Sequence, residues 1–147
     1  MTRLILTILV LTLSSAHAQS DNWSKLPFLP PPQYDHPYAG ELIINRVGPE
    51  VGVALSCPTA NFVTGRAIAC NLRTIGPGPK ERCEIFIAAD SVIASVGLTF
   101  DLVLRHEIGH CNGWPGDHPY ARYISEADIL VIRPIYRPYG DRHERRR

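Results

Sequence analysis

The 147-residue chain has little of what several large classes of protein require. Beyond an apolar stretch at the N-terminus, no hydrophobic run is long enough to cross a bilayer, which argues against a transmembrane helix. Neither sign of charge is in large excess, because 15 Lys and Arg face 14 Asp and Glu; nucleic acid is therefore not an expected partner. The chain also contains no Cys-x-x-Cys pair, which argues against a cysteine-based zinc site.

The apolar N-terminal stretch has the layout of a secretory signal peptide. Arg3 supplies the positive charge, residues 4–13 form a short apolar run, and Ala16-His17-Ala18 resembles a cleavage site. Residues 1–18 are therefore predicted to be a signal peptide, and the mature protein to be periplasmic or secreted. Without Arg3, 14 of the 15 basic residues remain to balance the 14 acidic ones. The remaining length suits one small domain.

Cysteine is the residue type that such an exported domain uses for stabilisation. The four cysteines, all within the mature part, are Cys57, Cys70, Cys83 and Cys111. An even number predicts two disulfides, each typically worth about 2–4 kcal/mol. Three pairings are possible, and the sequence does not choose among them. Our working prediction pairs Cys57 with Cys70, to join a local strand pair. It pairs Cys83 with Cys111, to tie a strand to the helix described below.

The expected layout of the mature chain has three parts. Residues 19–40 form a proline-rich arm, 41–132 a catalytic domain and 133–147 a basic tail. Five prolines between residues 26 and 38 favour extended chain, either a spacer or an arm laid over the surface. The arginine-rich tail is expected to be a solvated terminus.

Short β-branched runs mark the expected strands. Residues 41–47 and 51–56 are predicted to form a strand, turn and strand unit. A further strand or irregular stretch covers 61–72, and 83–88 is the strongest strand candidate. Strands followed by one long helix predict an α+β fold. This fold has a small mixed β-sheet, then the helix, then an irregular C-terminal segment.

The helix carries the pattern His-Glu-x-x-His at residues 106–110. Residues four apart lie on one face of a helix, so His106 and His110 can bind one metal ion with Glu107 beside them. The flanking residues support this helix. Thr99 is a suitable N-cap, and Gly113 favours the left-handed turn that ends many helices.

A catalytic zinc needs a third protein ligand and an open position for water. Asp117 and His118, which follow the turn after the helix, are the nearest candidates. We predict His118 as the ligand, because a neutral imidazole completes a three-histidine site and a longer turn can bring it back to the metal. Asp117 is the alternative third ligand, or else a hydrogen-bond partner of a ligand histidine.

This arrangement resembles the zincin metalloproteases, and especially the metzincin pattern HExxHxxGxxH. His106, Glu107, His110 and Gly113 match that pattern. Two features depart from it: Gly116 stands at the third-ligand position, and Met1 is the only methionine, so the methionine turn of metzincins is missing. The string HEIGHCNGWPGDH also resembles a group of small exported bacterial proteins of unassigned function.

The resemblance implies an exported metallopeptidase with one Zn²⁺ and a peptide or protein substrate. A zinc-activated water would attack the peptide bond, with Glu107 as general base. By the same resemblance, the strand at 83–88 would be the sheet edge that pairs with the substrate. Two alternatives remain. One is a non-catalytic envelope binding or assembly protein that keeps the fold, and the other a zinc-dependent peptidoglycan amidase or peptidase.

Overall fold

The computed structural model describes residues 22–58, 60, 65–74 and 81–128. The predicted signal peptide and basic tail lie outside the described residues. Along the chain the elements are η1 (Trp23–Lys25), β1 (Pro27–Leu29), β2 (Glu41–Gly48), α1 (Glu50–Ser56), β3 (Ala69–Thr74), β4 (Arg82–Ala88), α2 (Asp90–Ser95), α3 (Phe100–Cys111) and β5 (Arg122–Tyr123). Within the described ranges, no helix is long and apolar enough to cross a membrane.

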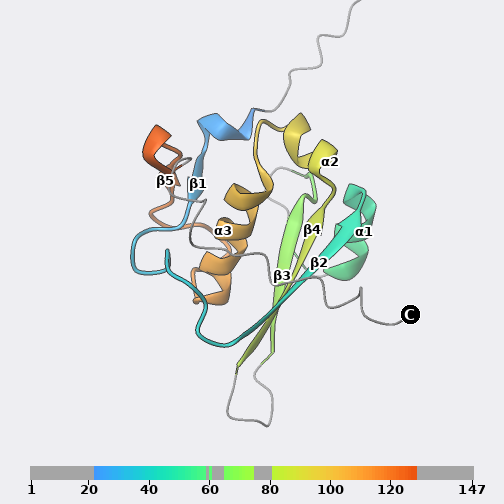
Figure 1. The fold of residues 1–147 in the computed structure, drawn as a ribbon, viewed down its shortest axis with the longest axis horizontal. Coiled ribbons are helices and arrows are strands. Elements are labelled where there is room, and N and C mark those ends of the chain that lie inside the picture. Colours follow the sequence, from blue (N-terminus) through green and yellow to red (C-terminus); the bar gives the residue numbers. More distant parts are fainter. Residues whose placement is uncertain (1–21, 59, 61–64, 75–80, 129–147) are drawn as a thin grey trace, which may run out of the picture.

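The main sheet has three strands in the order β2-β4-β3 (Figure 1). Strand β2 runs parallel to β4 and β3 runs antiparallel to it, so the sheet is mixed and the fold is α+β, as predicted. A second sheet pairs β1 with β5. The prediction that the strand at 83–88 forms a sheet edge is wrong, because β4 is bonded on both sides and leaves the edges to β2 and β3.

The two faces of β4 pack against different helices. Ile85 and Ile87 belong to the larger core, which also contains the apolar residues of α3. Phe86 and Ala88 pack with the smaller core around Val53 of α1. Because successive side chains of a strand point to opposite faces, α3 and α1 lie on opposite sides of the sheet (Figure 1).

Residues 50–56 form helix α1, so the predicted second strand is wrong. Val53 and Cys57, four residues apart, are both buried in the smaller core, which is the spacing of one helix face. Gly52 allows the helix to pack closely, because a Cβ atom there would clash with the carbonyl oxygen of Val47. The β-branched residues of this stretch favour a strand, but the burial of Val53 and Cys57 on one side favours the helix that forms.

Two disulfides join these elements with the predicted pairing, Cys57 with Cys70 and Cys83 with Cys111. The first links the C-cap of α1 to β3, where we had expected a strand pair. The second links β4 to the last residue of α3. All four cysteines are buried. Such bonds are typical of proteins outside the reducing cytoplasm.

Helix α3 has both of the ends that the sequence predicts. The Thr99 side chain accepts a hydrogen bond from the backbone N–H of Leu102, and Asp101 lies in the first turn. After Cys111 the chain turns at Gly113, whose φ of 98° lies in the left-handed region. The helix is therefore continuous from Phe100 to Cys111 and carries both His106 and His110.

The proline-rich segment packs into the core and is not a spacer. Phe28 and Leu29 are buried, and β1 pairs with β5 at the far end of the described chain. Pro30 approaches α3 so closely that a Cβ atom at Gly109 would lie 2.7 Å from the Pro30 Cβ. The N-terminal arm therefore forms one wall of the structure beside α3.

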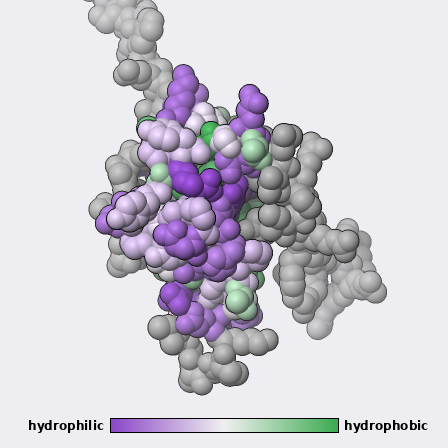
Figure 2. All heavy atoms as spheres, turned by 90° about the vertical axis from the view of Figure 1, so that its left-hand side faces the viewer, coloured by the Kyte–Doolittle hydropathy of each residue, from purple (hydrophilic) through white to green (hydrophobic). Residues whose placement is uncertain are grey.

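A group of ion pairs fastens this arm to α3 and to β5. Asp35 of the arm binds Arg105 of α3 and Arg122 of β5, each at 2.5 Å. Arg105 also lies 3.0 Å from Asp128. The Asp35 and Arg105 side chains are only 13% and 14% exposed, so this pair is largely shielded from water. The surrounding surface, which faces the viewer in Figure 2, is mostly hydrophilic in its described part.

Candidate metal centre

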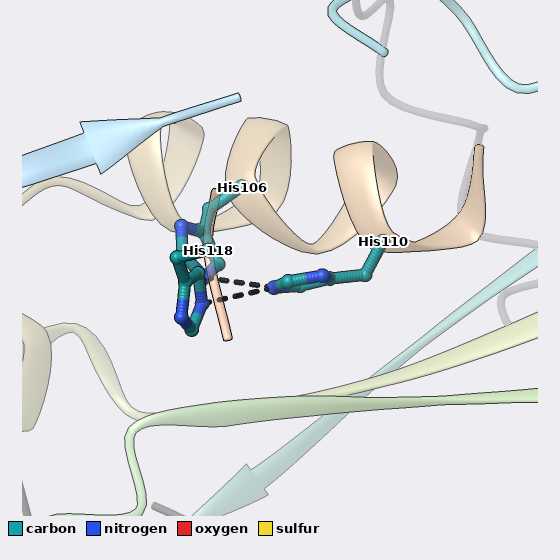
Figure 3. Close-up of side chains that lie close together, drawn as sticks. All are labelled: His106, His110 and His118. Carbon is teal, nitrogen blue, oxygen red and sulfur yellow. Dashed lines mark hydrogen bonds between the residues drawn. The ribbon is translucent and has the colours of Figure 1, made fainter. Parts of the chain in front are cut away.

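Three histidine side chains converge beside α3 (Figure 3). His106 and His110 project from the helix, and His118 comes from the loop that follows it. The Nε2 atom of His106 lies 3.1 Å from those of both His110 and His118, and the latter two are 3.2 Å apart. Within the described ranges this is the one group of His, Cys, Asp or Glu side chains placed to hold a metal ion.

Two backbone carbonyls determine which nitrogen of each helix histidine carries the proton. The Nδ1 atom of His106 lies 2.5 Å from the Phe28 carbonyl oxygen, and that of His110 lies 2.8 Å from the Trp114 carbonyl oxygen. A carbonyl oxygen only accepts, so each Nδ1–H donates and each neutral ring keeps a bare lone pair on Nε2. Two such lone pairs 3.1 Å apart repel unless a positive charge lies between them.

The spacing of the three nitrogens fits a small divalent cation. Ligand nitrogens about 2.0–2.1 Å from a tetrahedral zinc ion lie about 3.3 Å apart. The observed separations of 3.1 and 3.2 Å are close to that value. Three imidazoles are also a donor set that zinc accepts, with a fourth position left for water or substrate. The residues present therefore fit a metal ion.

Burial keeps these imidazoles neutral. It is the main cause that lowers the pKa of His110 and His118, and it lowers the pKa of His106 well below the usual value. The nearby His110 lowers the pKa of His106 further, whereas Asp117 acts in the opposite direction on His118. Neutral imidazoles have the free lone pair that metal binding requires.

Glu107 lies next to the histidines but is held by the sheet. It is buried, and the side-chain amide of Asn71 on β3 donates a hydrogen bond of 2.8 Å to its Oε2 atom. Burial raises the pKa of Glu107 to about 7, and the bond from Asn71 opposes that rise. A carboxyl group with a pKa near neutrality can both accept and release a proton at physiological pH.

A cavity of about 580 Å³ opens beside these groups. The three histidines and Glu107 line it, together with Asn71. Most of its remaining wall is apolar and comes from the arm, from the start of β3 and from α3, including Trp23, Leu26, Phe28, Ile68 and Val103. A cavity of this size with a few polar groups at one end is typical of a ligand-binding site.

The two candidates for the third ligand take different places in the structure. His118 belongs to the converging group, whereas Asp117 lines the cavity without belonging to it. The metal-binding role of His106, His110 and His118 stays a prediction, as does the catalytic role of Glu107.

Sequence reasoning missed three contributors to the site. The Phe28 carbonyl orients His106, but every residue has a carbonyl, so the sequence carries no signal for it. Asn71 is a polar residue at a strand position that faces the helix, which is a weak signal. Trp114 follows directly after Gly113, where the chain turns at the end of α3. A large aromatic residue so close to the motif is the strongest signal of a contribution to the site among the three residues.

Comparison with protein-family models, with curated proteins and with solved structures gives no significant match for this chain. What the structure itself supports is a candidate metal-binding centre in a small α+β domain.

Proposed function

We propose that the protein is an exported zinc metallopeptidase. His106, His110 and His118 hold one Zn²⁺, and Glu107 is the general base. The observation that carries this proposal is the convergence of the three Nε2 atoms, two of them with bare lone pairs, on one point. Glu107, a buried carboxyl group with a pKa of about 7, lines the same cavity as the three histidines.

The chain's own residues divide the chemical work. Bound zinc would lower the pKa of a water molecule and polarise the peptide carbonyl. Asn71 binds Oε2 of Glu107 and so leaves Oε1 to take the proton of the attacking water. The carboxyl group then passes the proton to the leaving amine. This relay requires the pKa of Glu107 to lie between that of the water that donates the proton and that of the amine that accepts it. No serine or cysteine nucleophile is required.

Strand β3 supports a peptide as the substrate. It is an edge of the main sheet, and residues 68–71, at its start, line the cavity that holds the histidines. An extended peptide can add to such an edge by main-chain hydrogen bonds. We propose β3 for the pairing role that the sequence analysis gave to the strand at 83–88.

The decisive experiment compares zinc-loaded wild type with Glu107→Gln on a peptide library read by mass spectrometry. We expect cleavage by the wild type and a loss of about 10²–10⁴-fold in the variant, because proton transfer is removed. Zinc content, measured by elemental analysis, should be equal in both. Glu126→Gln makes the same chemical change at an exposed position and should behave as wild type.

Other outcomes would contradict the proposal. A zinc-loaded wild type that cuts no peptide would rule out a peptidase and favour the binding or assembly alternative. Cleavage of cell-wall peptides without cleavage of casein would assign the peptidoglycan amidase instead.

A further inference from the structure

The indole ring of Trp114 contacts all three histidines. Its ring centroid lies 4.8 Å from that of His110, 4.9 Å from that of His118 and 5.2 Å from that of His106. It is stacked on His110 and meets the other two edge-on. Trp114 is only 2% exposed, so neighbouring groups enclose its ring almost completely.

Trp114 also makes hydrogen bonds at both ends of the loop that joins His110 to His118. Its backbone N–H donates to the Gly109 carbonyl, and its carbonyl accepts from Nδ1 of His110. Its side-chain Nε1–H donates to the carbonyl oxygen of Pro119 at 3.0 Å. Pro119 directly follows His118, so one side chain restrains the backbone next to the third histidine.

The backbone on either side of Pro119 needs such a restraint. His118 has a φ of 57° and Tyr120 a φ of 59°, both in the left-handed region. A residue with a Cβ atom adopts this region less readily than glycine does, because its Cβ atom lies too close to the following carbonyl oxygen. The carbonyl that Trp114 binds lies between these two strained positions.

We propose that Trp114 is the positioning residue of the metal centre. Its ring is the surface against which the three imidazoles pack, and its Nε1–H holds the strained loop so that His118 faces the other two histidines. This inference rests on the proposed metal site but not on the proposed peptidase activity. Residues that orient metal ligands typically change metal affinity by about 10–100-fold when they are replaced.

The first test measures zinc affinity of the mature protein by competition with a chromophoric chelator. Trp114→Phe keeps an aromatic ring but removes the Nε1–H donor, and we expect zinc binding to weaken by about 10–100-fold. The absorption of the cobalt-substituted variant should also change, because it reports coordination geometry. Tyr123→Phe is the control. Tyr123 is an exposed aromatic residue on β5 that does not line the cavity, so this variant loses a side-chain donor elsewhere and should bind zinc within about twofold of wild type.

A double-mutant cycle separates positioning from a general structural role. His118→Ala removes the ligand through which Trp114 acts, so adding Trp114→Phe to it should cause no further loss of zinc affinity. Independent, additive losses would overturn the proposal, and so would unchanged affinity in Trp114→Phe alone.

A second variant covers the case in which Trp114→Phe does not fold. In the Trp23→Phe background, replacing the remaining tryptophan by benzothienylalanine puts sulfur in place of Nε1–H and keeps the ring size. We expect the same loss of zinc affinity relative to Trp23→Phe alone, and an affinity equal to that of Trp23→Phe would overturn the proposal. Zinc binding that depends on Trp114 without peptide cleavage would overturn the peptidase and leave this inference standing. A wild type that binds no zinc would overturn both.

Discussion

Helix α3 is held on one side by the sheet and on the other by the N-terminal arm, and the two contacts differ in kind. The sheet side is apolar and covalent, with buried residues of β4 in the same core and the Cys83–Cys111 disulfide. The arm side also buries Phe28 and Leu29 in this core, but it adds several polar contacts. Asp35 binds Arg105, and Asn112 at the end of the helix donates to the carbonyls of Tyr34 and His36.

This difference suggests that one set of contacts determines the stability of α3 and the other determines the orientation of the polar side chains at the site. Apolar burial and a disulfide stabilise the helix without specifying how its polar side chains point. The carbonyl oxygen of Phe28, by contrast, fixes the ring of His106. The exception on the sheet side is Asn71, which fixes Glu107. We therefore expect the sheet to govern stability and the proton-transfer group, and the arm to govern the proposed ligands.

The largest expected effect is the loss of the disulfide on the sheet side. Cys83→Ala with Cys111→Ala opens a link across 28 residues, which should lower the free energy of unfolding by about 3–4 kcal/mol. Urea denaturation measures this loss. The control pair, Cys57→Ala with Cys70→Ala, opens a link across 13 residues and should lose about 3 kcal/mol. Zinc affinity should stay nearly unchanged in both folded pairs, because the rings of His106 and His110 are oriented by carbonyls of the arm and of the loop after α3. A loss of zinc affinity in the first pair alone would break the comparison.

A somewhat smaller effect concerns Glu107 and pH in the metal-free protein. Burial raises its folded pKa from 4.5 to about 7, so its favourable contribution to stability is complete below pH 4.5 and is lost as pH rises through about 7. Glu107→Gln cannot ionise and keeps an oxygen for Asn71. The variant should therefore match wild type near pH 4.5 and exceed it by roughly 3 kcal/mol at pH 8.

Urea titrations at several pH values measure this difference. The histidines, whose pKa values are lowered, lose their contribution as pH falls, but both proteins share that change and it cancels. A stability difference that does not grow with pH would show that Glu107 is not buried as described.

The smallest effect is expected on the arm side. Asp35→Asn removes the charge that Arg105 and Arg122 share, but Asp128 still faces both arginines. We expect a loss of about 2 kcal/mol of unfolding free energy, less than for an isolated buried pair. Thermal unfolding checks it. Asp90→Asn breaks an exposed ion pair with Arg46 and should change stability by less than about 1 kcal/mol. If Asp35→Asn lowers the free energy of unfolding no more than Asp90→Asn does, the arm is held by packing alone.

Local signals made α3 predictable from the sequence. Its N-cap at Thr99, its stop at Gly113 and the spacing of His106 and His110 are all set within a few turns of chain. Helix α1 was not predictable in the same way. Its β-branched residues suggested a strand. The helical pattern became clear only from the structure, in which Val53 is buried against the sheet.

The rest of the site depends on contacts between distant parts of the chain. Asn71 reaches Glu107 because it lies opposite Ile85 in the sheet register, on the face that packs against α3. Phe28 lies 78 residues before His106 and contributes only a backbone atom. Neither strand register nor the path of a backbone carbonyl can be read from residue types, so these parts required the structure.

The close approach of Pro30 to Gly109 has a consequence for recognising related chains. Glycine inside a helix costs about 1 kcal/mol relative to alanine, yet here a Cβ atom would meet Pro30 at 2.7 Å. One of the two free positions in His-Glu-x-x-His is therefore not free in this protein. A sequence that replaced Gly109 would need a smaller or displaced residue at position 30. We expect these two positions to vary together among homologues, which makes the pair a better search signature than the motif alone.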